Sequence, residues 1–200
     1  RAFFTETETG REIWNNILKK AGVVVIASNP VGPAATFSTR ERLDTVESLE
    51  GTLARVLTKA DRVRWGALNV GKMVSMPTRE VYTGLQNGLI DTVTTTPGGI
   101  KSYSWWETLN SAQLPYQIFA DAYLMANAKW YNSLPPELRA ILDEVGSEIT
   151  KEATDDIMSA SNAVIEEFKA RGGKVFELSG AELEKMQALE REKMDDGYAK

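Results

Sequence analysis

Apolar and polar positions follow two patterns along the chain. In some segments apolar residues recur every three to four positions, which is typical of a helix with one buried face. Other segments are short apolar runs bounded by turn residues, which indicate buried strands. The predicted helices cover 11–21, 59–68, 78–88 and 102–109; the predicted extended segments cover 23–27, 35–39, 53–57, 72–76, 89–94 and 117–126; loops are expected at 29–33 and 95–99. The alternation of strands and helices predicts an α/β architecture.

The C-terminal third has a different pattern. From Pro135 to Arg171 one apolar stripe continues at helical spacing, with prolines at its start and two glycines after its end. At ~1.5 Å per residue such a helix is roughly 55 Å long, which exceeds the needs of one small domain. The stripe is rich in Ala and Ile rather than regular Leu heptads, which favours a strut across two lobes over a coiled coil. Gly146 is a candidate bend, and a strand over 174–178 and an amphipathic helix, opened by a capping box over 179–182, are predicted to follow.

The composition excludes several kinds of chemistry. The chain has 200 residues, 42% of them hydrophobic and 26% charged, as expected of a soluble globular protein. It contains no cysteine and no histidine, which excludes thiol nucleophiles, disulfides, Cys/His zinc sites and Ser-His-Asp triads. Adjacent acidic residues on the predicted helices point in different directions and cannot share a substrate. These exclusions leave carboxylate or Lys/Tyr chemistry, or binding alone. Because no acid–base pair has a plausible spacing, we expect a binding protein rather than an enzyme, with no metal and no cofactor.

Charge is unevenly distributed along the sequence. The net charge of −5 disfavours nucleic acid as a partner. Within residues 51–79, however, six basic residues stand against the single acidic residue Asp61. Such a basic cluster is a candidate anion site. For most of these side chains, and for Arg62 and Arg64 in particular, the preferred interpretation is an exposed helix face.

Arg55 is the exception, because it lies inside the predicted apolar strand 53–57. A cation in such a strand is costly unless it has a partner. Two interpretations stay open from the residues alone: a structural arginine, exposed or paired with an acid, and an arginine that binds an anionic ligand. For the second, the planar guanidinium suits a carboxylate because it can donate two parallel hydrogen bonds.

Four motifs together resemble one family. Residues 49–56 (L-E-G-T-L-A-R-V) resemble the D-L-x-G-x-x-x-R-V segment of DctP-type solute receptors, the extracytoplasmic binding proteins of tripartite ATP-independent periplasmic (TRAP) transporters. Residues 76–91 are similar to that family's M-P-x-x-E-V-Y-x-A-L-Q-x-G-x-V-D. Trp105-Trp106-Glu107 matches an aromatic-aromatic-Glu position, and residues 130–137 resemble the W-x-x-L-P-x-E start of a long helix.

The resemblance implies a type II periplasmic-binding-protein fold with two lobes and a long strut helix across both. Lobe one would comprise 1–31 and about 120–150, with its N-terminal strands absent; lobe two would comprise 32–119. The helix over 135–171 would span both lobes, and 172–200 would form a C-terminal strand and helix. The family's segment before Gly10, which supplies the first strands of lobe one, has no counterpart in this sequence. We therefore expect the apolar surface that those strands would cover to be covered either by a separate N-terminal fragment or by self-association of the chain.

The implied function is that of a periplasmic receptor that binds a small organic acid and delivers it to the membrane permease subunits of a TRAP transporter. The alternative is an extracytoplasmic sensory or structural module without a transport role. The resemblance makes Arg55 the carboxylate anchor. The other implied ligand contacts are the hydroxyls of Thr95, Thr58 and Thr78, the apolar walls Trp105 and Phe37, and the polar residue Asp121.

The sequence departs from the family pattern inside this expected site. Ala35 stands near the place of a second arginine, Thr95 near that of an asparagine, and Thr78 at that of a cleft aromatic residue. We therefore expect one strong carboxylate anchor in a smaller, hydroxyl-lined pocket.

Overall fold

The computed structural model describes the backbone of residues 8–198 and the side chains within 13–153 and 156–193. These residues form two compact units. The first unit comprises residues 8–31 and 121–157, and the second comprises 32–120 and 158–198. The strands β1 and β5 and the helix α7 contribute residues to both units.

The elements alternate as the hydrophobic pattern predicts. The strands are β1 (Val23–Ser38), β2 (Leu53–Val56), β3 (Lys72–Ser75), β4 (Thr92–Thr95), β5 (Ser111–Asn127) and β6 (Lys174–Glu177). The α-helices are α2 (Glu8–Ala21), α3 (Lys59–Ala67), α4 (Val81–Gln86), α5 (Pro97–Ser102), α6 (Ala128–Ser133), α7 (Pro136–Ala170) and α8 (Gly180–Tyr198). Single 3-10 turns are η1 (Glu47–Leu49), η2 (Thr78–Glu80) and η3 (Trp105–Glu107).

The strands form a six-stranded sheet in the order β3-β2-β4-β1-β5-β6. β2 runs parallel to both β3 and β4, and β5 runs parallel to β6. β1 pairs with β4 in the antiparallel direction over residues 35–38. Arg55 lies on β2, between β3 and β4, and its register partner on β3 is Val74.

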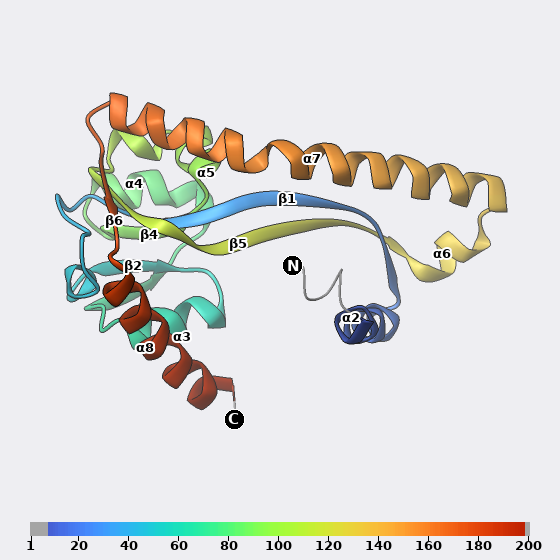
Figure 1. Ribbon diagram of the computed structural model, residues 1–200, viewed down its shortest axis with the longest axis horizontal. Helices are drawn as coiled ribbons and strands as arrows, with labels where there is room; N and C mark the ends of the chain where they lie inside the picture. Colours follow the sequence, from blue (N-terminus) through green and yellow to red (C-terminus); the bar gives the residue numbers. More distant parts are fainter. Residues whose placement is uncertain (1–7, 199–200) are drawn as a thin grey trace. The chain divides into compact units, whose positions relative to one another are not determined.

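Two hydrophobic cores cover the two faces of this sheet. One core lies on the face of α4, α5, η3 and the end of α7, and it includes Phe37, Val93, Trp105 and Phe168. The other lies against α3 and α8, which run beside each other in Figure 1, and it includes Trp65 and Met186. Because side chains alternate along a strand, Arg55 faces the first core while its neighbours Ala54 and Val56 face the second.

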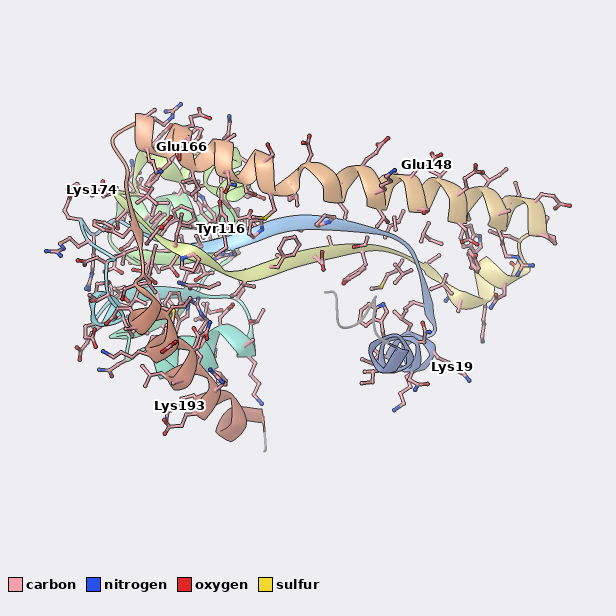
Figure 2. The ribbon with its side chains drawn as sticks, in the orientation of Figure 1. Lys19, Tyr116, Glu148, Glu166, Lys174 and Lys193 are labelled. Atoms are coloured by element: carbon pink, nitrogen blue, oxygen red, sulfur yellow. The ribbon has the colours of Figure 1, made fainter. Side chains whose placement is uncertain are left out.

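The helix expected over 135–171 is observed as α7. In the first unit Gly146 lies inside α7 without interrupting it, and a Cβ atom there would come within 2.0 Å of the carbonyl oxygen of Ile26 on β1. Nearby, the amide of Ser28 donates to the hydroxyl of Thr150 at 2.9 Å. In the second unit α7 is held by a hydrogen bond from the Tyr116 hydroxyl (Figure 2) to Asn162 at 2.9 Å.

Two expected loops are wrong. The segment 29–33 is not a loop, because β1 continues through Pro30 and Pro33 as one strand of 16 residues. The segment 95–99 contains the start of α5, whose first turn is capped by the Thr96 hydroxyl accepting from the Gly99 amide. The helix expected over 102–109 is correspondingly replaced by the end of α5 and by η3.

The capping box expected before α8 forms only in part. The Ser179 hydroxyl accepts from the Glu182 amide at 3.3 Å. The Glu182 carboxylate, however, accepts from the amide of Val46 at 2.7 Å, so this side chain joins α8 to the segment before η1.

Candidate functional site

Arg55 is buried on β2 of the second unit. Arg55 is 7% exposed. Its Nε donates to the Met76 carbonyl oxygen at 3.1 Å, and its Nη2 donates to the Thr78 hydroxyl at 2.9 Å. Its own carbonyl oxygen accepts from the indole nitrogen of Trp65 at 3.1 Å. The guanidinium is therefore held by neutral oxygens on the side of the sheet that carries the first core.

Aromatic rings adjoin this guanidinium. Its central carbon lies 5.7 Å from the centre of the Trp105 ring, a cation–π contact. The ring of Trp105 is in turn stacked on the ring of Tyr103, with 5.4 Å between ring centres and 23° between ring planes. Burial lowers the pKa of Arg55, and the negative charge of Asp61 opposes that shift.

Among the described residues, no carboxylate forms an ion pair with Arg55. Arginine nevertheless stays cationic in proteins, and an unpaired buried cation is costly. As far as the described residues go, neither structural interpretation left open by the sequence, an exposed arginine or one paired with an internal acid, matches this geometry. A carboxylate bound at Arg55 would supply the missing negative charge.

The hydroxyls of Thr78 and Thr95 are partly buried on the Arg55 side of the sheet. Thr78, at the start of η2, already contacts Arg55. Thr95 ends β4, and its register partner is Ala35. A Cβ atom at Gly99 would lie only 2.6 Å from the Thr95 hydroxyl oxygen, so glycine at that position leaves room for it.

Thr58 is exposed, and its hydroxyl caps α3. It accepts from the amide of Asp61 at 3.1 Å, while the Asp61 carboxylate accepts from the amides of Leu57 and Thr58. This reciprocal capping box stabilises the first turn of α3. A ligand contact by Thr58 stays a prediction.

The two residues expected to form apolar walls are both core residues. Phe37 is fully buried and meets the ring of Phe168 edge-on at 6.0 Å between centres. Trp105 is 1% exposed and contacts Arg55 and Tyr103. Their roles as walls stay predictions, and Trp105 is the one that the structure brings together with Arg55.

Asp121 belongs to the first unit, where its carboxylate accepts from the Tyr123 hydroxyl at 3.4 Å. Arg55, by contrast, belongs to the second unit. Its role as a ligand contact stays a prediction.

Sequence reasoning missed Tyr103, the exposed aromatic residue beside this site. Tyr103 caps the C-terminal end of α5 and is 52% exposed. Its position two residues before the Trp-Trp-Glu motif is the signal that could have found it.

Arg64 corrects a second expectation. The sequence pattern assigned Arg64 to the same exposed helix face as Arg62, but Arg64 is 4% exposed whereas Arg62 is exposed. Its Nε pairs with the Glu190 carboxylate of α8 at 2.7 Å, and its Nη1 donates to the Thr94 hydroxyl at 2.9 Å. Its Nη2 donates to the side chain of Gln117, and its guanidinium carbon lies 5.0 Å from the centre of the Trp65 ring. The assignment failed because α8 and β5, both distant in sequence, cover this position.

Two further properties bear on the class of site. Within the described residues, acidic side chains form no cluster of three or more that could hold a metal ion. None of the helices in this part of the chain is long and apolar enough to cross a membrane.

Comparison with known proteins identifies the family. The model of DctP, the bacterial extracellular solute-binding protein family 7, matches residues 1–200. The chain belongs to the DctP family. This confirms the resemblance that the motifs around Arg55, Glu80 and Trp105 indicated.

Related proteins agree with this assignment. A solute-binding protein of Albidiferax ferrireducens is 27% identical over 122 residues, which is 60% of this chain and 36% of the relative. The fold is similar to that of a TRAP periplasmic solute-binding protein from Desulfovibrio salexigens with bound orotic acid, with a TM-score of 0.85 and 22% identity over 96% of this chain and 61% of that one. It is also similar to a Bordetella pertussis extracytoplasmic solute receptor binding pyroglutamic acid, with a TM-score of 0.84 and 18% identity over 96% of this chain and 64% of that one.

The predicted fold class, a two-lobe α/β periplasmic-binding fold, is confirmed by the similarity to these two solved structures. The chain spans about a third of the curated relative and about three fifths of each of these two structures.

Proposed function

We propose that this DctP-family chain is the ligand-binding part of a periplasmic receptor that captures a small organic carboxylate. The receptor would deliver this solute to the membrane permease subunits of a TRAP transporter. The single observation that carries the proposal is the buried guanidinium of Arg55, which has hydrogen-bond acceptors but no carboxylate partner among the described residues. Binding of a carboxylate would compensate this charge through two parallel hydrogen bonds.

The surroundings of Arg55 support the proposal. The hydroxyl of Thr78 and the ring of Trp105 hold the guanidinium in place, so part of the ordering cost is met before a ligand arrives. The related receptors are described with orotic acid and pyroglutamic acid, and both compounds carry a carboxylate. The family is one of solute-binding proteins, and we propose that this chain likewise binds its solute without catalysing a reaction.

Capture would depend on hinge closure. A ligand shifts a two-lobe receptor toward its closed state only if it binds that state more tightly than the open one. Arg55 in the second unit would supply the charged contact, and contacts from the other lobe would supply the preference for closure.

The test is titration calorimetry on the natural protein at its full length. The panel contains mono- and dicarboxylates, including pyroglutamate and orotate, and the neutral amide of each acid. We expect at least one acid to bind with a defined stoichiometry, and its amide to bind at least tenfold more weakly because the amide lacks the charge that pairs with Arg55. An acid and its amide that bind equally well would contradict the proposal.

A further inference from the structure

The segment from Met76 to Thr78 supplies both hydrogen-bond acceptors of the Arg55 guanidinium. The Met76 carbonyl oxygen accepts from Nε at 3.1 Å, and the Thr78 hydroxyl accepts from Nη2 at 2.9 Å. Met76 directly follows β3, and Thr78 begins η2. Because the guanidinium is planar, two acceptors on two of its nitrogens fix the orientation of the whole group.

Pro77 lies between these two acceptors and restricts both of them. Its φ is −63° and its ψ is 150°, and its ring holds φ near this value. The ring also disfavours the α conformation of the preceding residue, which favours an extended Met76 and leaves the Met76 carbonyl few alternative directions. Pro77 is itself exposed, so its ring contributes little to the core and its restriction of the backbone is its main effect.

The two hydrogen bonds leave one edge of the guanidinium available. An arginine carries five N–H donors, one on Nε and two on each terminal nitrogen. Within the described residues, Met76 and Thr78 take the Nε donor and one Nη2 donor, and the other three donors are all on Nη1 and Nη2. The buried polar atoms that lack a partner in this part of the chain include no atom of Arg55, so Nη1 is open to the surface.

We propose that a ligand carboxylate binds Arg55 end-on, at Nη1 and Nη2, and that Pro77 is the positioning residue that directs this edge toward the ligand. The inference rests on the proposed function, since it requires a carboxylate at Arg55, and it adds the binding mode. A carboxylate can pair with two parallel donors along the Nε–Nη2 edge or along the Nη1–Nη2 edge. Met76 occupies Nε, so the second edge is the one left for the ligand.

This arrangement lowers the cost of binding. A guanidinium whose orientation is already set loses less freedom when the ligand arrives. Without Pro77, the Met76 carbonyl can turn away from Nε and the guanidinium plane can rotate. Because the change acts on the anchor alone, we expect the affinity to fall by the same factor for acids of different shape.

The experiment is calorimetry on the full-length natural protein with pyroglutamate, orotate and succinate. Pro77→Ala should bind each acid that wild type binds about two- to fivefold more weakly. Pro77→Gly should bind more weakly still, because glycine frees its own φ as well. Pro136→Ala is the matched control: Pro136 is an exposed proline at the first position of α7, and its loss should leave the affinity unchanged. Circular dichroism melting checks that the variants fold.

A double-mutant cycle separates positioning from general destabilisation. Lysine lacks both the Nε donor and the planar fork, so Met76 and Thr78 cannot orient it as they orient Arg55. Pro77→Ala should therefore weaken binding in the wild-type background but not in the Arg55→Lys background. Thr78→Ser keeps the acceptor and should keep the wild-type affinity, while Thr78→Val loses the hydroxyl and should bind about two- to tenfold more weakly.

A crystal structure of the natural protein with one of these acids tests the binding mode directly. We expect the two carboxylate oxygens at hydrogen-bond distance from Nη1 and Nη2, with Nε still bonded to Met76. A carboxylate oxygen on Nε, or Pro77 variants that bind all the acids as tightly as wild type, would overturn the inference and leave the carboxylate function in place. If wild type binds none of the acids, or if Arg55→Ala binds them as wild type does, the carboxylate function itself fails.

Discussion

Replacing Arg64 by alanine should destabilise the second unit far more than its position on a charged helix suggests. The substitution removes the ion pair with Glu190, the hydrogen bonds to Thr94 and Gln117, and the packing on Trp65. It leaves the Glu190 carboxylate, whose side chain is 20% exposed, without this cation.

The magnitude follows from burial. Removing one partner of a buried pair costs about 3–5 kcal/mol. Because Glu190 keeps some exposure to water, we expect the lower end, about 3 kcal/mol. With a urea dependence of about 3 kcal/mol per molar, at the upper end for small proteins, the unfolding midpoint should fall by about 1 M urea.

The assay is urea unfolding followed by circular dichroism. Arg62→Ala is the matched control, because Arg62 is an exposed arginine of the same helix and its loss should cost less than about 1 kcal/mol. Arg64→Lys keeps the charge but not the planar donor group, so it should fall between wild type and Arg64→Ala. Equal midpoints for Arg64→Ala and Arg62→Ala would refute the reasoning.

Two further predictions concern the first unit. Gly146→Ala should lower the melting temperature, because its Cβ would lie 2.0 Å from the Ile26 carbonyl oxygen. The overpacking cost of about 1–3 kcal/mol exceeds the gain in helix propensity of about 1 kcal/mol. The control is Gly66→Ala in α3, which should not destabilise, because its Cβ would lie 3.6 Å from the flexible end of Met73. The 200-residue chain alone should associate with a second copy through an exposed apolar stripe of α7. Its apparent mass in size-exclusion chromatography should therefore rise with protein concentration. The double variant Ile141→Glu, Val145→Glu should elute as a monomer. The stripe consists of Leu138, Ile141, Val145 and Ile149. A lower melting point for both glycine variants alike, or a wild-type chain that is monomeric at every concentration, would contradict these predictions.

Local pattern was enough to predict most elements of the second unit. β2, β3 and α3 lie where short apolar runs and helical spacing placed them, and α7 begins and ends at the expected prolines and glycines. β1 was missed as a single strand because Pro30 and Pro33 are typical of loops. The pairing of β1 with β4 covers residues 35–38, so neither proline has to donate a hydrogen bond to that neighbour.

The candidate site was predictable only where one residue contradicted its own local pattern. Arg55 is a cation in an apolar strand, and that conflict is visible in the sequence. Arg64 shows no such conflict, because the groups that bury it come from β4, β5 and α8. Tyr103 is likewise ordinary in sequence, and its stacking on Trp105 becomes visible only in the packed structure.

The most direct test of the central claim is the affinity of the full-length natural protein for its best carboxylate ligand, measured by calorimetry with wild type, Arg55→Ala and Arg79→Ala. The account predicts that Arg55→Ala loses about 2–5 kcal/mol, roughly 30- to 5,000-fold in affinity, because the ligand carboxylate then has no cationic partner in a buried site. Arg79→Ala removes an arginine next to Thr78 whose side chain is 84% exposed, and it should change the affinity by less than about 1 kcal/mol. If Arg55→Ala binds the ligand as tightly as wild type does, Arg55 is structural and the carboxylate-receptor account is wrong.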